Sequence, residues 1–146
     1  MPAFVRLSKD DMYRVRRACA ESLAEISKNV SEDIRLGVLV EIFIRLTHDP
    51  SKLVKQSILQ QSGLFIATLP ARSVNDNILG QYCSMNTSPT GDVSVDNELK
   101  QICAFSFPAV LSVIGPKRWP DVREGSHLIM HAYTIFYILL LHILTP

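Results

Sequence analysis

The chain has 146 residues, with 15 basic and 14 acidic side chains and a formal net charge of +1 at neutral pH. This balance creates no strong field towards nucleic acid or an anionic membrane surface, so we expect no nucleic-acid partner. The three cysteines lack Cys-x-x-Cys spacing, which fits a reducing compartment, and residues 1–10 contain no apolar leader.

Helical periodicity begins near Asp11, after a lead-in over residues 1–8 that we expect to be too short for a full helix. Between residues 11 and 29 the side chains of one helical face are mostly apolar: Val15, Ala18, Cys19, Ser22, Leu23 and Ile26. Ser31, Glu32 and Asp33 then form a capping signal. They predict a second helix to about residue 47, with the apolar positions Ile34, Val38, Leu39, Ile42, Phe43 and Leu46.

One phrase occurs twice in this part of the chain. Asp10 precedes Val15-Arg16, and Asp49-Pro50 precedes Val54-Lys55 at the same spacing. Each Asp can cap a helix, and Pro50 suits a first helical position, where no N–H is needed. We therefore predict a third helix over residues 49–69, with Val54, Ile58, Phe65 and Leu69 on its stripe. A phrase that returns after about 40 residues predicts an all-α superhelix of stacked helical repeats.

Residues 70–97 differ from the rest because Ser, Asn, Asp, Thr, Pro and Gly are abundant there. We expect a flexible loop, with at most a short helical turn over residues 77–85. Ser88-Pro89 has the form of a proline-directed phosphorylation site. Such dipeptides are common by chance, so an unmodified loop is the favoured interpretation.

A fourth helix is predicted over residues 95–114, before Gly115-Pro116, with the apolar positions Leu99, Ile102, Cys103, Phe105, Val110, Leu111 and Ile114. Pro108 removes one backbone hydrogen bond inside it, so we expect a kink. Residues 119–123 then give a weaker third copy of the phrase, in which Lys117 stands at the position of the Asp.

These phrases resemble the HEAT repeat, in which an Asp-containing turn follows one helix and Val-Arg opens the next. Five segments are also similar to a family of regulatory subunits of Ser/Thr protein phosphatase 4: residues 13–22, 46–56, 81–85, 103–108 and 119–124. The resemblance covers roughly residues 13–124 and implies a shortened paralogue or isoform that starts at the second helix of a repeat. It implies a non-catalytic scaffold whose partner is the phosphatase 4 catalytic subunit.

The same resemblance implies roles for single residues. Arg16, Lys55 and Arg123 are expected to bond to the Asp or to carbonyls of an adjacent repeat, whereas Arg14 and Arg17 stay ambiguous between the fold and an acidic partner. A partner is expected to meet the second helices of the repeats, around residues 17–25 and 56–63. With about two and a half repeats, we expect low stability, self-association or dependence on a partner.

The repeats are expected to occupy residues 1–124, and residues 125–146 form a separate hydrophobic tail. Three interpretations of the tail stay open: a helix packed on its neighbours, a membrane anchor through residues 127–144, or an exposed end that is disordered or degraded. A membrane-tethered interaction protein, or a product without phosphatase binding, is therefore the alternative to a cytoplasmic or nuclear scaffold.

Groups for chemistry are not brought together by any motif in the sequence. We find no nucleophile with a base partner, no glycine-rich phosphate loop and no paired carboxylates in an apolar stretch. His127 and His131 have the spacing of a metal pair, but no acidic residue or cysteine in the tail completes a site. We therefore predict no enzyme, no catalytic residue, no cofactor and no metal ion.

Overall fold

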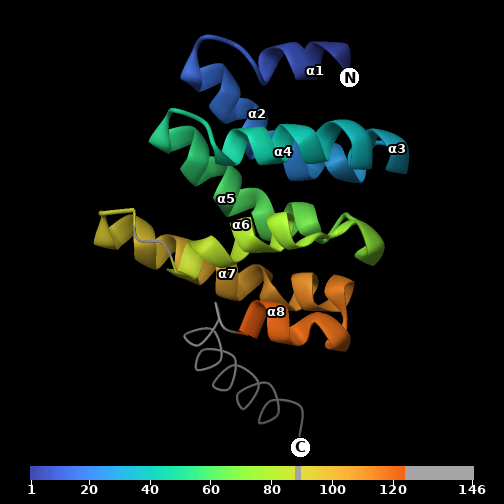
Figure 1. Cartoon of the computed structure of the whole chain (residues 1–146). Helices are drawn as coiled ribbons and strands as arrows, with labels where there is room; N and C mark the ends of the chain where they lie inside the picture. The colour runs from blue at the N-terminus through green and yellow to red at the C-terminus, as the bar shows by residue number, and fades with distance from the viewer. Residues whose placement is uncertain (88–89, 124–146) are drawn as a thin grey trace, which may run out of the picture.

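The computed structural model describes residues 1–87 and 90–123, and all regular structure within them is helical (Figure 1). The prediction of an all-α fold is confirmed. The elements in chain order are α1 (Pro2–Leu7), α2 (Tyr13–Lys28), α3 (Glu32–Ile34), the π-helical segment η1 (Arg35–Leu39), α4 (Val40–Thr47), α5 (Lys52–Ile66), the 3-10 segment η2 (Ala71–Ser73), α6 (Asp76–Thr87), α7 (Val93–Ile114), the 3-10 segment η3 (Pro116–Arg118) and α8 (Trp119–Arg123).

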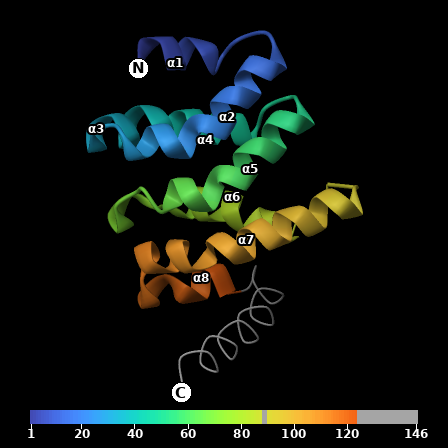
Figure 2. The ribbon, with the colours of Figure 1, turned by 180° about the vertical axis from the view of Figure 1, so that it is seen from behind.

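The helices form two layers that run the length of the stack. Helices α2, α5 and α7 pack on one another in that order, and we call them the inner layer. Helices α1, α4 and α6 each pack against the inner helix that follows in sequence, and α8 packs on α6; with α3 and η1 they form the outer layer. The stack therefore has the alternating order of a HEAT-like repeat superhelix, as Figures 1 and 2 show from opposite sides.

The core lies between the two layers and is built from the predicted apolar stripes. Val54 and Ile58 of α5 are fully buried. The rings of Phe43 in α4 and Phe65 in α5 stack with their centroids 5.0 Å apart, which joins the outer and inner helices of one pair. Because each stripe is covered only by neighbouring helices, stability is a sum of the packing within each outer–inner pair and the packing between successive pairs.

The start of the chain differs from the prediction. Residues 2–7 form α1, which has a proline in its first turn and is followed by Ser8, whose hydroxyl donates back to the Val5 carbonyl (2.9 Å). Proline suits this position because the first-turn N–H groups have no helical partner. The described chain therefore includes a short outer helix before α2, and the expectation that it starts at the second helix of a repeat is wrong.

The two Asp residues of the repeated phrase do not occupy the helix caps. Met12 and Ser51 are the N-cap residues of α2 and α5, without a side-chain capping bond. Asp10 instead accepts the Met12 N–H (2.9 Å) and Asp49 accepts the Ser51 N–H (2.8 Å), two residues further on. Pro50 lies in this turn and not at the first helical position, so the predicted helix starts were placed too early.

The segment 70–97 is not a loop throughout, because η2 and α6 lie within it. Ile78, Leu79 and Tyr82 of α6 are all at least 97% buried. Their spacing places them on one helical face, although the polar residues between them conceal that face in the sequence. The predicted short turn at residues 77–85 is thus a full outer-layer helix. Ser88-Pro89 lies outside the described residues.

The end of the described chain also corrects the sequence interpretation. Asp92 is the N-cap residue of α7, and its carboxylate accepts the N–H groups of Ser94 (2.9 Å) and Val95 (3.3 Å). The C-cap residue of α7 is Gly115, where φ is +72°. Residues 119–123 form α8 in the outer layer, so the third copy of the phrase opens an outer helix and not an inner one. Pro108 lies inside α7, which is an inner helix.

The predictions for the hydrophobic tail concern residues 125–146, including His127 and His131, which lie outside the described residues. In the part of the chain that the structure describes, no helix is both long and apolar enough to cross a membrane.

Candidate interaction surface

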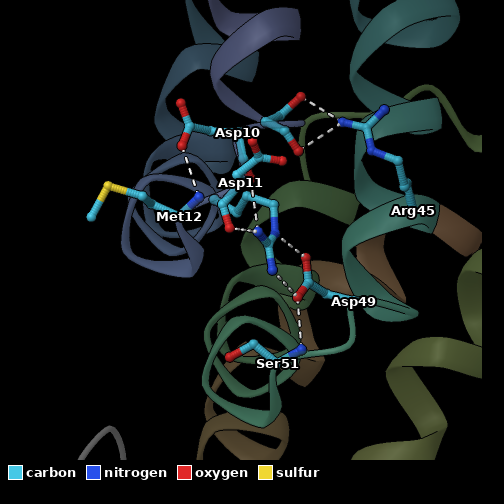
Figure 3. A network of polar contacts seen from close by, with 8 residues as sticks. Asp10, Asp11, Met12, Arg45, Asp49 and Ser51 are labelled. Atoms are coloured by element: carbon cyan, nitrogen blue, oxygen red, sulfur yellow. Dashed lines mark hydrogen bonds and ion pairs between the residues drawn. The ribbon is translucent and has the colours of Figure 1, made fainter.

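Arg16 joins the first two inner helices at their N-terminal ends. Its Nε donates to Asp49 Oδ2 (2.7 Å) and its Nη2 donates to Asp49 Oδ1 (3.0 Å), while Nη1 donates to the carbonyls of Asp10 (2.7 Å) and Asp11 (2.9 Å). Figure 3 shows this network around Asp49. Only 14% of the Arg16 side chain and 5% of the Asp49 side chain are exposed. The bond to the Asp of the next repeat, which the resemblance implied for Arg16, is present.

This environment changes the protonation of both partners. Burial raises the pKa of Asp49, but the hydrogen bonds from Arg16 and from the Ser51 N–H outweigh it, so the pKa lies below its ordinary value. The hydrogen bond to Asp49 raises the pKa of Arg16. Both groups are therefore charged near neutral pH, and the pair is a partly buried, bidentate ion pair.

The other arginines and lysines of the repeated phrase behave differently. Lys55 is exposed and acts on Asp49 only through the attraction of its charge. The side chain of Arg123 lies outside the described part. Arg14 Nε donates to the Tyr13 hydroxyl (3.5 Å), and Arg17 pairs with Glu21 (2.7 Å) on the exposed face of α2.

Two further arginines, which the sequence interpretation missed, also bridge the helices. Arg35 at the start of η1 donates from Nε to the Ser27 carbonyl (2.9 Å), from Nη1 to the Thr68 carbonyl (2.6 Å) and from Nη2 to the Val30 carbonyl (3.0 Å). It thereby joins the C-terminal ends of α2 and α5. Arg45 of α4 donates to the carbonyl and hydroxyl of Ser8 after α1. Each Arg is flanked in the sequence by two apolar residues, which was the available signal.

A cavity of about 540 Å³ lies beside the Arg16 network, lined by Ser8, Lys9, Asp10, Asp11, Arg16, Arg45, His48, Asp49 and Pro50. The guanidinium groups of Arg16 and Arg45 are already bound to Asp49 and Ser8. The two guanidinium groups at this cavity therefore hold helices together and are not unoccupied ligand-binding groups. Among residues 1–87 and 90–123 no group of three or more His, Cys, Asp or Glu side chains is placed to hold a metal ion.

The junction between α5 and α7 is built differently, around Gly63. A β-carbon at Gly63 would overlap the Ser106 side chain of α7, so the absence of a side chain allows the two helices to approach. The Tyr82 hydroxyl of α6 donates to the Cys103 carbonyl (2.6 Å) and lies 3.2 Å from Ser106 Oγ. Burial raises the pKa of Tyr82, so its hydroxyl stays protonated and able to donate. Gly63 is therefore the point of closest approach between α5 and α7.

The predicted partner-facing segment on α2 contains charges that pair with one another. Glu21 bonds to Arg17 (2.7 Å) and accepts the Ser57 hydroxyl (3.3 Å) of α5, and Lys28 bonds to Glu25 (2.8 Å). In the segment 56–63, both Ser57 and Gly63 are buried. These segments are thus only partly available to a partner.

An exposed apolar position on α7 was predicted to lie in the core. Phe105 is 86% exposed, and Leu64 of the neighbouring α5 is 43% exposed. Phe107, which is not in the predicted stripe, is buried instead. The rest of the predicted stripe is buried or half-buried, so the error concerns Phe105 alone. An apolar residue can satisfy helical spacing next to a stripe without being covered by a neighbouring helix.

The alternating layers and the Arg16–Asp49 bond define the class of repeat to which this stack is similar. The sequence profile of the HEAT repeat matches residues 1–30, which hold α1 and α2.

More particularly, the chain is similar to "Serine/threonine-protein phosphatase 4 regulatory subunit 1" of Homo sapiens, with 35% identity over 89 residues, or 61% of this chain and 9% of that protein. The protein of the same name from Mus musculus is 33% identical over 89 residues. That from Rattus norvegicus is 41% identical over 59 residues, or 40% of this chain and 6% of that protein. The chain thus spans less than a tenth of the length of these relatives. No solved structure gives a significant match.

Proposed function

We propose that this chain is a non-catalytic scaffold that binds the catalytic subunit of Ser/Thr protein phosphatase 4. The observation that carries the proposal is the 35% identity, over 61% of the chain, to a protein named as a regulatory subunit of that phosphatase. We assign the binding to the helical repeats within residues 1–124 and treat residues 125–146 as a separate segment.

Two features of the structure support a binding role: the charged groups of the Arg16 network are used within the fold, and apolar side chains are exposed on the inner layer. The charged side chains of the Arg16 network bond to each other and to main-chain carbonyls, so they hold the repeats in register. The inner layer, by contrast, exposes Phe105 and Leu64 on neighbouring helices. A rigid stack with an exposed apolar face is suited to holding another protein.

The proposal places the scaffold in the cytoplasm or the nucleus. Burial raises the pKa of the Cys19 and Cys83 thiols, so both stay protonated near neutral pH. Protonated, partly shielded thiols are poor nucleophiles, which agrees with a structural role in a reducing compartment.

Co-precipitation tests this proposal and its membrane-tethered alternative together. The full chain and a chain ending at residue 124 are each expected to retain the purified phosphatase 4 catalytic subunit. Absence of retention by both would overturn the proposal. Recovery of the full chain in the membrane fraction, with phosphatase retained only there, would favour the tethered alternative.

A further inference from the structure

We propose that the phosphatase catalytic subunit docks an apolar segment, flanked by a basic side chain, on a patch formed by Leu64, Phe105 and Glu98. We call these residues the Phe105 patch. The inference rests on the proposed function and adds to it the contact surface and the chemistry of the partner's segment.

Two contacts fix how α5 and α7 lie relative to each other. Gln60 Nε2 donates to Glu98 Oε1 (2.9 Å), and further along both helices Gly63 meets Ser106. Since both contacts advance in the same chain direction, the two helices run parallel. Gly63 and Ser106 mark the line along which the helices face each other.

From this line, Leu64 and Phe105 turn towards the same side of the layer. Each residue rotates about 100° around a helix axis. In parallel helices, a step forward from Gly63 and a step back from Ser106 therefore lead to one common face. The exposed fractions of Leu64 (43%) and Phe105 (86%) agree with this placement.

The opposite steps lead to the buried side. Ser62, before Gly63, is fully buried, and Phe107, after Ser106, is 3% exposed. That side faces the outer layer, where Tyr82 of α6 bonds to Ser106 and Cys103. Phe105 and Phe107 thus lie on opposite sides of α7, and the side of Phe105 is the open one.

The side chains of the patch indicate the chemistry of the segment that it would bind. Leu64 and Phe105 form an apolar surface shared by two helices, and aromatic side chains of this kind act as anchors in protein interfaces. Glu98 lies on the same face, since it accepts from Gln60. Within the described residues Glu98 forms no ion pair. Glu98 Oε1 accepts from the neutral Gln60 amide, and no described basic side chain pairs with the carboxylate, so the carboxylate is available to a basic side chain of the partner beside the apolar anchor.

Equilibrium titration of the full-length chain with the purified phosphatase 4 catalytic subunit tests the apolar part. Phe105→Ser is expected to weaken binding at least about tenfold, as truncation of an interface anchor does. Val93→Ser is the matched control, because Val93 lies on the same helix and is 76% exposed, away from the patch. It should change binding by less than about twofold. Unaltered circular dichroism and melting temperature in both variants would show that folding is kept.

The charge is tested in the same titration with Glu98→Lys, which should weaken binding more at low salt than at high salt. The control is Glu41→Lys, the same charge reversal at an exposed position of the outer helix α4. An equal effect of both reversals would overturn the assignment of a basic partner group to Glu98.

The outcomes separate this inference from the proposed function. If the unaltered chain does not bind, both are overturned. If it binds and Phe105→Ser binds equally well, or no worse than Val93→Ser, only the Phe105 patch is overturned. If Phe105→Ser instead abolishes self-association of the chain in sizing chromatography and leaves phosphatase binding intact, the patch is an interface between copies and the inference is wrong.

Discussion

The junction between α2 and α5 and the junction between α5 and α7 join the same kind of helices by different means. At the first, Arg16 and Arg35 bridge the two ends of the helices through directed hydrogen bonds. At the second, Gly63 lets the helices approach at mid-length, and Tyr82 bonds to the carbonyl of Cys103. The first junction should therefore respond to changes of charge, and the second to changes of volume.

Helix α5 belongs to both junctions, so a change in its core should damage both. Val54 is fully buried, and Val54→Asp would place a carboxylate there without a partner. We expect a loss of about 4 kcal/mol or more in the free energy of unfolding, measured by urea denaturation. Val54→Ala, which only removes two methyl groups, should cost about half as much. A Val54→Asp protein that unfolds like the unaltered chain would contradict the packing of α5.

A change of volume should act on the second junction alone. Gly63→Val would push against Ser106 and is expected to cost about 2–3 kcal/mol in denaturant unfolding, in the range of an overpacked core. The matched control is Gly80→Ala in α6, where an added β-carbon would meet no neighbouring atom. That change should stabilise the chain by about 0.5–1 kcal/mol, because alanine is a better helix former. Equal destabilisation by both changes would show that the approach at Gly63 is not the constraint.

A change of charge should act on the first junction. Arg16→Ala leaves the 5%-exposed Asp49 carboxylate without its guanidinium. We expect a cost of about 2 kcal/mol, between that of an exposed pair and that of a fully buried one. Arg17→Ala removes an exposed pair with Glu21 and should cost less than about 0.5 kcal/mol. This ordering would be refuted if Arg16→Ala lowered the melting temperature less than Arg17→Ala does, or more than Val54→Asp does.

Acid should weaken the first junction before the second. The pKa of Asp49 is lowered in the folded chain, and the pKa of an Asp in the unfolded chain is about 4. The stability that Asp49 contributes is thus present above about pH 4 and is lost as the pH falls through the folded pKa. Asp49→Asn should therefore lose less stability than the unaltered chain when urea unfolding is repeated at about pH 3 in place of pH 6. An equal loss in both would assign the acid sensitivity to other carboxyl groups.

Some of this architecture could be predicted from the sequence because periodic stripes determine burial. Val54, Ile58 and Phe65 were correctly placed in the core, and the bond from Arg16 to Asp49 followed from the family resemblance. The helix boundaries were less certain, since an Asp can bond to a turn N–H two residues ahead as easily as it caps a helix, as Asp49 does.

The parts that were missed depend on contacts between distant segments. Helix α6 has only a few apolar residues, and they become a helical face when α5 and α7 cover them. Phe105 satisfies the same spacing as a core residue, and only the approach at Gly63 shows which side of α7 is open. The roles of Arg35 and Arg45 likewise depend on where α1, α2 and α5 end.

The bonds of Arg35 have a consequence for how this chain can vary. All three of its acceptors are main-chain carbonyls, and one of them belongs to Val30 at the end of α2. Every amino acid supplies a main-chain carbonyl, so Val30 can be replaced by other side chains that fit a half-buried position without loss of the hydrogen bond. The guanidinium has no such substitute, and a saturation library selected for folded protein should be permissive at position 30 and intolerant at position 35.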